Sequence, residues 1–327
     1  MSKSFAIFHR PALYLALTTL FIVGQFDASH ASVQKRRVRP ATSATTTGAS
    51  ASARSITVRT EPLAIIWLDE LRRGATDQSG KLNIMKISPG RHTLRVRASG
   101  FGERTLPVLP TQRGVVLVKL ARTTDAAELA FQEAETLREK ARDDETRQTA
   151  KAAYQRVLQL RSAYPAAHTG LARVLLDLND YSGALAEIAH ARRTRPVYPE
   201  ASAVEGRILR EDADPSGAIT AFRRAIREAR GFQPEAHTGL ARVYEDQGQY
   251  AEATTEFRTA IAQLADTEPA IYQLLGAAYE KQEKYKEAVA AYEKYLQLAP
   301  EGTYASAIRS FIDQLKRQAA EQQNPQS

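Results

Sequence analysis

The chain has 327 residues, enough for two modest domains that each bury a core of their own. It carries 45 basic and 37 acidic side chains, a formal net charge of +8. It has no cysteine, which excludes disulfides, thiolate metal sites, thiol catalysis and a lipid-modified N-terminal cysteine.

A secretory signal peptide is expected over residues 1–31. Lys3 and Arg10 precede an apolar run over residues 11–23, and small residues lead to a cleavage position after Ala31. The run is shorter than the roughly 20 apolar residues that a membrane span needs. An uncleaved N-terminal anchor is therefore the alternative, and the only membrane contact we expect. The pattern predicts export across the cytoplasmic membrane, to the periplasm or the cell envelope.

Residues 32–54 have the composition of a disordered linker. They hold five basic side chains, no acidic ones, and a long run of alanine, serine and threonine after Pro40. Such a segment cannot bury enough apolar surface to fold. We expect a flexible basic tether ahead of the folded part of the protein.

Residues 55–122 are predicted to form strands. Apolar and polar residues alternate, as in Leu94-Arg95-Val96-Arg97, and glycine or proline punctuates the runs. Short strands at this spacing, with one apolar face, are typical of a small antiparallel β-sandwich. The stretch carries twelve basic and five acidic side chains, so the domain is strongly basic.

Several short motifs in this domain follow a known pattern. They are Thr60 with Pro62, Trp67-Leu68-Asp69 before Gly74, the run from Leu82 to Ile87 ahead of Pro89-Gly90, and Gly100-Phe101. Together they resemble a PEGA domain, a small β module common in bacterial envelope proteins. The family's name-giving residues are poorly kept, because Pro62-Leu63-Ala64 stands where Pro-x-Gly-Ala is usual. The resemblance implies a β fold and an envelope location, with no defined ligand.

An eight-residue stretch, Ala-His-Thr-Gly-Leu-Ala-Arg-Val, occurs at residues 167–174 and again at 236–243. The offset of 69 residues is close to two units of about 34, the period of one class of helix–turn–helix repeats. Small residues recur where paired helices must approach: Ala172, Gly206, Ala241 and Gly276 in the first helices, and Ala184, Ala218, Ala253 and Ala288 in the second. These units resemble tetratricopeptide repeats, which implies a right-handed solenoid that binds a protein segment in its concave groove.

The expected fold class is therefore α+β multidomain, a small antiparallel β-sandwich followed by an all-α tetratricopeptide-repeat solenoid. We expect a degenerate leading hairpin over residues 125–164, four repeats over 165–300, a capping helix over 301–320 and a disordered tail over 321–327. Four tyrosines of the last repeat are expected mostly in the core: Tyr279, Tyr285, Tyr292 and Tyr295.

The sequence gives no sign of catalytic, cofactor or metal chemistry, so we expect neither an enzyme nor a cofactor. The histidines have no partners at zinc-ligand spacing, and His168 and His237 occupy equivalent repeat positions that favour packing. A phosphate-binding glycine loop and a nucleophile-elbow serine are both missing from the sequence. Nucleic acid is not an expected partner. Export would place the protein away from nucleic acid, and the basic residues are not interleaved with aromatic ones.

Arginines recur at one position of the first helices, which line the inner face of such a solenoid. Arg173, Arg207 and Arg242 are one repeat apart, and Arg210 lies one turn beyond Arg207. Guanidinium groups bind carboxylates in bidentate fashion. This ladder predicts a groove for an acidic peptide segment or for the C-terminal segment of a partner protein.

In an alternative interpretation, acidic residues of the same helices neutralise the ladder arginines. Each repeat-spaced arginine is followed four residues later by an acid, and these acids are Asp177, Glu211 and Asp246. Cation before anion is the weaker order for such a pair, worth a few tenths of a kcal/mol. The sequence leaves open whether the ladder binds a partner or is neutralised within its own helices.

Three functions fit these features. The first is an exported, non-catalytic protein-interaction scaffold or adaptor of the cell envelope, with a protein segment in the repeat groove. The second is a structural envelope protein whose basic β domain holds an anionic surface polymer. The third is a regulatory subunit of an envelope enzyme complex.

Overall fold

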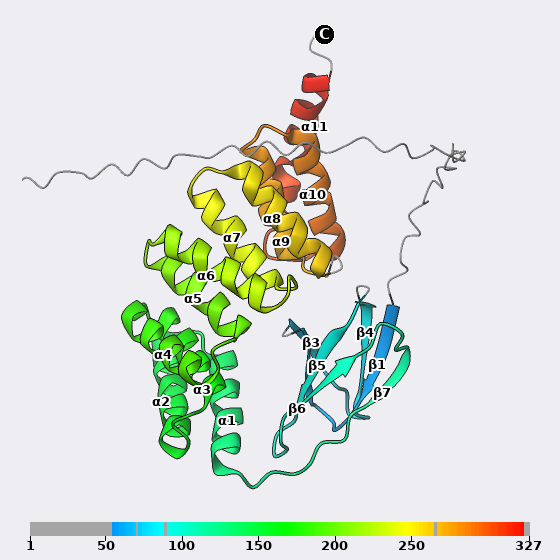
Figure 1. The fold of residues 1–327 in the computed structure, drawn as a ribbon. Helices are drawn as coiled ribbons and strands as arrows, with labels where there is room; N and C mark the ends of the chain where they lie inside the picture. Colours follow the sequence, from blue (N-terminus) through cyan, green and yellow to red (C-terminus); the bar gives the residue numbers. More distant parts are fainter. Residues whose placement is uncertain (1–53, 70, 88–89, 265–266, 324–327) are drawn as a thin grey trace, which may run out of the picture. The chain divides into compact units, whose positions relative to one another are not determined.

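The computed structural model describes residues 54–323, apart from residues 70, 88–89 and 265–266. The expected signal peptide and nearly all of the expected linker therefore lie outside the described residues. Within the described part, seven strands are followed by helices (Figure 1). None of those helices combines the length and the apolar character that crossing a membrane requires.

The strands form two small sheets packed face to face. The three-stranded sheet has the order β4-β1-β7, and the four-stranded sheet the order β3-β2-β5-β6. The strands are β1 (Arg54–Arg59), β2 (Ile65–Leu68), β3 (Leu71–Ala75), β4 (Lys81–Ile87), β5 (His92–Arg97), β6 (Arg104–Val108) and β7 (Gly114–Leu117).

The core of this β module lies between the sheets. Ile56 and Val58 of β1 and Ile84 of β4 pack with Leu94 and Val96 of β5, and all five are buried. The expected alternation along β5 is therefore confirmed for its apolar face. Burial of one face of each sheet fixes the strand register, because a one-residue slip would turn every core side chain outward.

Two details differ from the expected antiparallel sandwich. β1 and β7 pair in parallel, with Ile56 opposite Gly114 and Thr57 opposite Val115. A parallel pair needs a long crossover, and here the chain passes through the second sheet between the two strands. β1 also begins at Arg54, which was assigned to the linker. The Arg54 guanidinium donates to the Gly90 carbonyl oxygen at 2.8 Å, anchoring the strand's first residue.

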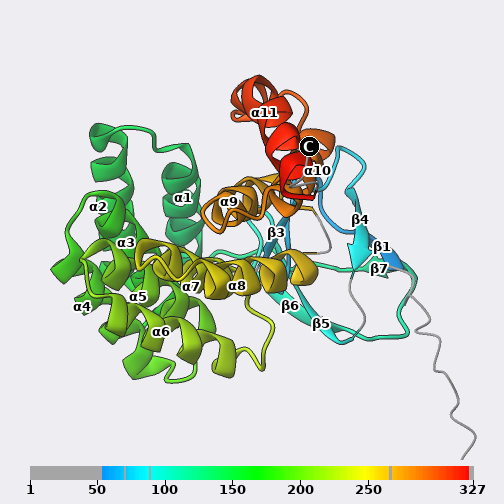
Figure 2. The ribbon, with the colours of Figure 1, turned by 90° about the horizontal axis from the view of Figure 1, so that it is seen from above.

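Among the described residues, ten helices form five antiparallel pairs, and α11 packs on the last of them (Figure 1). Figure 2 shows successive pairs stacked along the chain order. The helices are α1 (Ala126–Lys140), α2 (Asp144–Leu160), α3 (Pro165–Asp177), α4 (Tyr181–Thr194), α5 (Pro199–Glu211), α6 (Pro215–Glu228), α7 (Pro234–Asp246), α8 (Tyr250–Gln263), α9 (Pro269–Glu280), α10 (Tyr285–Leu298) and α11 (Ala305–Gln323).

Close approach within a pair depends on the small residues that the sequence repeats. A Cβ added to Gly206 of α5 would lie 2.6 Å from the ring of Phe222 on α6. The same relation joins Gly276 of α9 and Tyr292 of α10, at 2.7 Å. The glycine leaves room for the partner's aromatic ring, which fills the space between units and is almost fully buried.

Tyr292 and Tyr295 form the core between α10 and the closing helix. Both are buried with Ile308 and Ile312 of α11, while Tyr279 and Tyr285 pack partly buried against the same cluster, so the expected core role of these tyrosines is confirmed. Tyr295 stands where the repeat pattern would place a small residue. Its hydroxyl accepts a hydrogen bond from the Tyr304 amide at 3.0 Å, which ties down the turn before α11.

First helices of successive pairs contact each other directly, as α3 does α5 and α5 does α7. In a curved stack this is the concave side, because the helices there crowd together. We call the surface formed by α3, α5, α7 and α9 the inner face. It carries the arginines that the sequence singles out.

Candidate functional site

The structure brings three of the four ladder arginines to one depression of the inner face, of about 380 Å³. We call it the inner groove and define it by residues of α5, α7 and α9: Arg207, Arg210, Glu235, Thr238, Arg242 and Ile271. The fourth arginine, Arg173 of α3, lies in a neighbouring polar cavity of about 320 Å³.

Arg173 and Arg207 are paired across successive inner helices. The Arg173 guanidinium donates to Glu200 of α5 at 2.5 Å and lies 3.7 Å from Glu235 of α7. Arg207 of α5 lies 3.8 Å from the same Glu235. Each acid comes from the first turn of the next inner helix, where a carboxylate also faces the positive end of the helix dipole.

These ion pairs explain why the ladder arginines differ in exposure from one helix to the next. α5 and α7 both begin with Pro-Glu, at residues 199–200 and 234–235, whereas α9 begins with Pro269-Ala270. No acid of α9's first turn therefore faces Arg242, whose ion pair is with Glu245 of its own helix at 3.8 Å. The side chain of Arg242 is 40% exposed, against 19% for Arg173. Arg242 is the more available cation.

The acidic residues that pair with the ladder arginines differ from those that the four-residue spacing within each helix suggested. The observed ion pairs do not follow the four-residue spacing that pointed to Asp177, Glu211 and Asp246. Arg210 instead donates to Asp246 on α7 at 2.7 Å and to neighbouring Glu211 at 2.8 Å. The arginines are therefore neutralised mainly between repeats, because successive inner helices contact each other directly.

Burial and charge act in opposite directions at the centre of the inner face. Burial alone would raise the pKa of Glu200, but the charges of Arg173 and Arg95, together with hydrogen bonds from Arg173 and Tyr198, outweigh it and lower that pKa. The pKa of Arg173 is raised, because Glu200 and Glu235 overcome the same burial effect. Both groups are thus charged at neutral pH, and the pair is part of the solenoid's own structure.

The β module reaches this region through a buried arginine. Arg97 of β5 is one of the polar residues that alternate with the apolar ones along this strand, yet only 5% of it is exposed. Its guanidinium donates to Glu103 at 2.7 Å and to Glu135 of α1 at 3.3 Å. It also lies over the rings of Trp67 and Phe131, at 5.1 and 4.7 Å from their centroids. Because Arg97 contacts α1, it lies in the interface between the β module and the helices, stacked on aromatic rings.

Leu71, the first residue of β3, is a further groove residue, and it comes from outside the repeats. Its side chain lines the inner groove and packs against the buried cluster that contains Ile271 and Leu275 of α9. Sequence reasoning identified neither Leu71 nor the acids Glu200 and Glu235. The recurrent Pro-Glu start was a usable signal for the acids, whereas nothing in the pattern of β3 marks Leu71.

The two repeat-equivalent histidines have structural partners. His168 is hydrogen-bonded through Nδ1 to Glu187 at 2.5 Å, and His237 in the same way to Glu256 at 2.6 Å. Each bond joins the first helix of a pair to the second. Within the described residues no group of three or more potential ligands could hold a metal ion.

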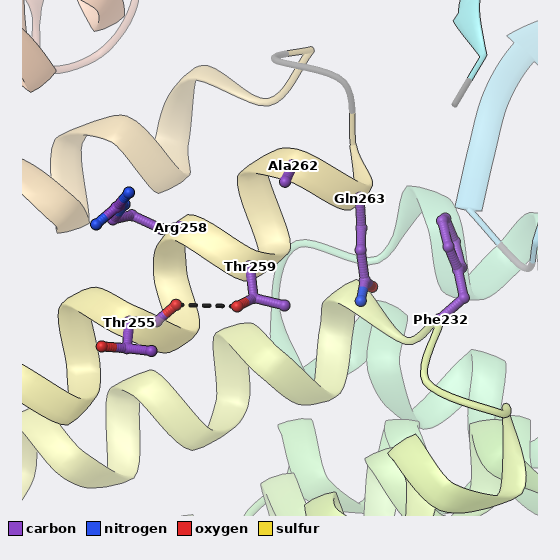
Figure 3. A pocket seen from close by; sticks show the side chains of 6 residues that line it. All are labelled: Phe232, Thr255, Arg258, Thr259, Ala262 and Gln263. Carbon is purple, nitrogen blue, oxygen red and sulfur yellow. Dashed lines mark hydrogen bonds between the residues drawn. The ribbon is translucent and has the colours of Figure 1, made fainter. Parts of the chain in front are cut away.

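A larger hollow of about 660 Å³ lies along α8 (Figure 3). Phe232 and Gln263 lie at one end and Thr255 and Arg258 toward the other. Three of its polar side chains, those of Thr255, Thr259 and Gln263, donate hydrogen bonds to backbone carbonyl oxygens. Thr259 donates to the Thr255 carbonyl oxygen at 3.0 Å, and Gln263 donates to that of Gly231 at 2.8 Å. The inner groove, with charged groups on α5 and α7 and at the N-cap of α9, is the better candidate site.

Comparison with known families identifies the helical units. Two family models, each described as a tetratricopeptide repeat, match residues 141–208 and 232–301. These segments contain most of α2 to α5 and all of α7 to α10. Neither includes the β module, so its resemblance to PEGA domains stays a prediction from the motifs. No curated protein sequence shows a significant match to this protein.

Solved structures with a similar fold share little sequence with this protein. PilW, described as a widely conserved type IV pilus biogenesis factor, has a TM-score of 0.52 at 16% identity, covering 63% of this chain and 96% of PilW. PilF of Pseudomonas aeruginosa has a TM-score of 0.50 at 16%, covering 62% and 93%. A subunit of the APC/C hetero-tetramer Cut9–Hcn1 has 0.50 at 15%, covering 59% of this chain but 36% of that one. At such identities the likeness shows the fold alone.

Proposed function

We propose that this tetratricopeptide-repeat protein is a non-catalytic scaffold that receives an extended protein segment in its inner groove. The observation that carries the proposal is the seating of Leu71, a residue of another module, in that groove. The groove thus accommodates an apolar side chain delivered from a hairpin. Repeat solenoids bind partners on such concave surfaces.

We further propose that the protein acts outside the cytoplasm, as an adaptor of the cell envelope. The support is the signal-like pattern of residues 1–31 and the basic linker that follows. Fractionation with and without signal-peptidase inhibition tests this. Recovery of the protein in the cytoplasm would contradict it.

Ion pairs within the molecule weaken the alternative that the β module binds an anionic envelope polymer. Arg72 and Arg97 are engaged by Glu139 and Glu135 of α1, so part of the basic charge is already used within the molecule. Pelleting with purified cell wall tests that alternative directly. Binding at low salt that is lost at about 0.5 M salt, a condition that screens surface charge, would favour it over the scaffold.

Site-specific photocrosslinking tests the scaffold function. A photoreactive residue at Thr238, inside the inner groove, is expected to form an adduct with one partner protein in envelope preparations. Thr220 on α6 is a matched control, because both hydroxyls donate to the carbonyl oxygen four residues earlier, at 2.9 and 3.0 Å. Adducts from Thr220 alone, or from neither position, would reject the groove as the partner site.

Charge reversal at the groove adds a second arm to this experiment. Arg242→Glu is expected to change the yield of the Thr238 adduct, because the Arg242 side chain is 40% exposed and its ion pair within the described residues is a 3.8 Å contact in its own helix. Arg173→Glu is unsuitable, since it would place a buried carboxylate beside Glu200 and disturb the fold.

A further inference from the structure

The hairpin of β2 and β3 brings three consecutive side chains towards the helical repeats. β3 opens with Leu71, Arg72 and Arg73, and it pairs antiparallel with β2. Leu71 is partly buried against α9 and lines the inner groove. The protein itself therefore supplies one occupant of the groove that we assign to a partner.

The two arginines of the hairpin have different partners, since Arg73 donates to the Met85 carbonyl oxygen of β4 at 3.1 Å. Arg72 forms an ion pair with Glu139 of α1 at 2.9 Å. Arg73 loses solvent around its guanidinium, which lowers its pKa, while the charge of Glu268 at the start of α9 acts in the opposite direction. An apolar side chain followed by a cation thus meets the apolar part of the groove around Ile271 and a carboxylate on α1.

The wider charge distribution agrees with this match. Residues 55–122 hold twelve basic and five acidic side chains, whereas residues 125–327 hold 26 basic and 31 acidic ones. The ladder arginines do not make the inner face locally positive, because each has an acidic partner. These acids are Glu200, Glu235, Asp246 and Glu245. A basic segment is therefore better matched to the inner face than the acidic segment that the arginine pattern alone suggested.

We propose that the β2–β3 hairpin occupies the inner groove in cis, and that the external ligand is a protein segment of the same chemistry that competes with it. That chemistry is an apolar side chain followed by basic ones. The inference rests on the proposed function, and it adds the class of ligand and the contact that the ligand must displace. Hairpin and partner exclude each other, because both need the space beside Ile271.

Competition in cis makes a quantitative prediction. The apparent affinity for an external segment falls by the fraction of molecules whose groove is open. Burial of one leucine side chain corresponds to an equilibrium factor of roughly 10 to 100. Leu71→Asp, which destabilises the docked hairpin, is expected to tighten binding of an external segment by about that factor.

The probe is a fluorescent synthetic peptide with the sequence of residues 65–75, titrated by anisotropy against the purified full-length protein. The Leu71→Asp variant is expected to bind it about tenfold or more tightly than the wild type. Thr238→Trp, added to that variant, is expected to abolish binding by filling the groove. The matched control Thr220→Trp is expected to leave binding unchanged.

A second variant keeps Leu71 and tests the displacement directly. The natural protein has no cysteine, so Arg72→Cys with Glu139→Cys offers a bismaleimide only two sites. The linked protein, with its hairpin held in place, is expected to bind the peptide about tenfold more weakly than the same variant left unlinked. Circular dichroism of each variant reports whether the fold is kept.

Three results would overturn the inference. They are equal binding by the wild type and the Leu71→Asp variant, equal binding by the linked and unlinked forms, and equal or tighter binding of a peptide whose two arginines are replaced by glutamate. If Thr238 still captures a partner in envelopes, the scaffold function stands and only the cis-competition and its ligand class fall. If Thr238 captures nothing either, both proposals fall.

Discussion

Arg72 of β3 and Glu139 of α1 lie 2.9 Å apart and join the β module to the first helix of the solenoid. The two residues are 67 positions apart in the sequence, and each belongs to a face that sequence patterning would assign to solvent. With Arg97 and Glu135 they form the charged part of an interface whose apolar part is Leu71. The β module is thereby a covering element of the inner face.

Arg72→Glu is expected to loosen this interface while leaving both modules folded. The side chains of Arg72 and Glu139 are 47% and 28% exposed, and a pair at that exposure contributes about 0.2–1 kcal/mol. Hydrogen exchange should therefore quicken at the β2–β3 hairpin, with little change in the unfolding midpoint. The charge swap Arg72→Glu with Glu139→Arg should restore slow exchange.

A matched control for that experiment lies at the other end of the solenoid. Lys316 of α11 and Glu293 of α10 are also 2.9 Å apart, at 48% and 53% exposure. Lys316→Glu should leave exchange at the hairpin unaltered. Faster hairpin exchange in this variant too would mean that net charge, and not the interface pair, governs the hairpin.

Breaking the Arg173–Glu200 pair is expected to destabilise the solenoid. Each side chain is less than one-fifth exposed, and removing one member leaves the other charge without its main partner. Arg173→Met should cost on the order of 3 kcal/mol of unfolding free energy, measured by urea denaturation. Adding Glu200→Gln should recover part of that loss, so the two substitutions should be non-additive. Additive losses would show that the two side chains act independently.

Acid should remove the contribution of Glu200. Its pKa is lowered in the folded protein, because the charges of Arg173 and Arg95 and the hydrogen bonds from Arg173 and Tyr198 together outweigh the opposing effect of burial. A lowered pKa contributes stability that is complete above the unfolded value, near 4.5, and is lost as the pH falls through the folded value of about 2. The stability gap between wild type and Glu200→Gln should therefore narrow from about pH 5 to about pH 2. A constant gap would contradict this.

His168 should give stability a pH dependence of the opposite sign. Burial lowers its pKa, but hydrogen bonds with Glu187 and the Ser162 carbonyl group outweigh burial and raise the pKa above 6.5. The stabilisation is then complete below pH 6.5 and is lost as the pH rises through the higher folded value. Thermal unfolding of wild type and His168→Gln should therefore converge as the pH rises above 6.5. In a Glu187→Gln background this convergence should be weaker.

Gly206→Ala tests the close approach of paired helices. Its Cβ would lie 2.6 Å from the Phe222 ring, which neighbouring units enclose. Overpacking of this kind costs about 1–3 kcal/mol, against a gain of up to about 1 kcal/mol in helix propensity. A net loss in unfolding free energy is expected. Gly102→Ala is the control, since the nearest atom to its Cβ is 3.8 Å away. A more stable Gly206→Ala variant would refute the packing argument.

The sequence by itself determined the repeat architecture and the composition of the inner face. Small residues at the 34-residue period dictate paired helices, because only they let two backbones approach; Gly206 and Gly276 show this directly. The same period places Arg173, Arg207 and Arg242 on equivalent turns of three first helices. Positions of this kind recur at a fixed spacing along the chain, so the sequence alone reveals them.

Only the tertiary structure decided what those arginines and the β module face. Arg173 meets Glu200 because two helices pack side by side, and Arg97 is buried because α1 covers it. The seating of Leu71 against Ile271 joins segments 200 residues apart. Contacts of this kind depend on how modules dock, and docking energy comes from surfaces that exist only once each module has folded. No periodicity in the sequence records them.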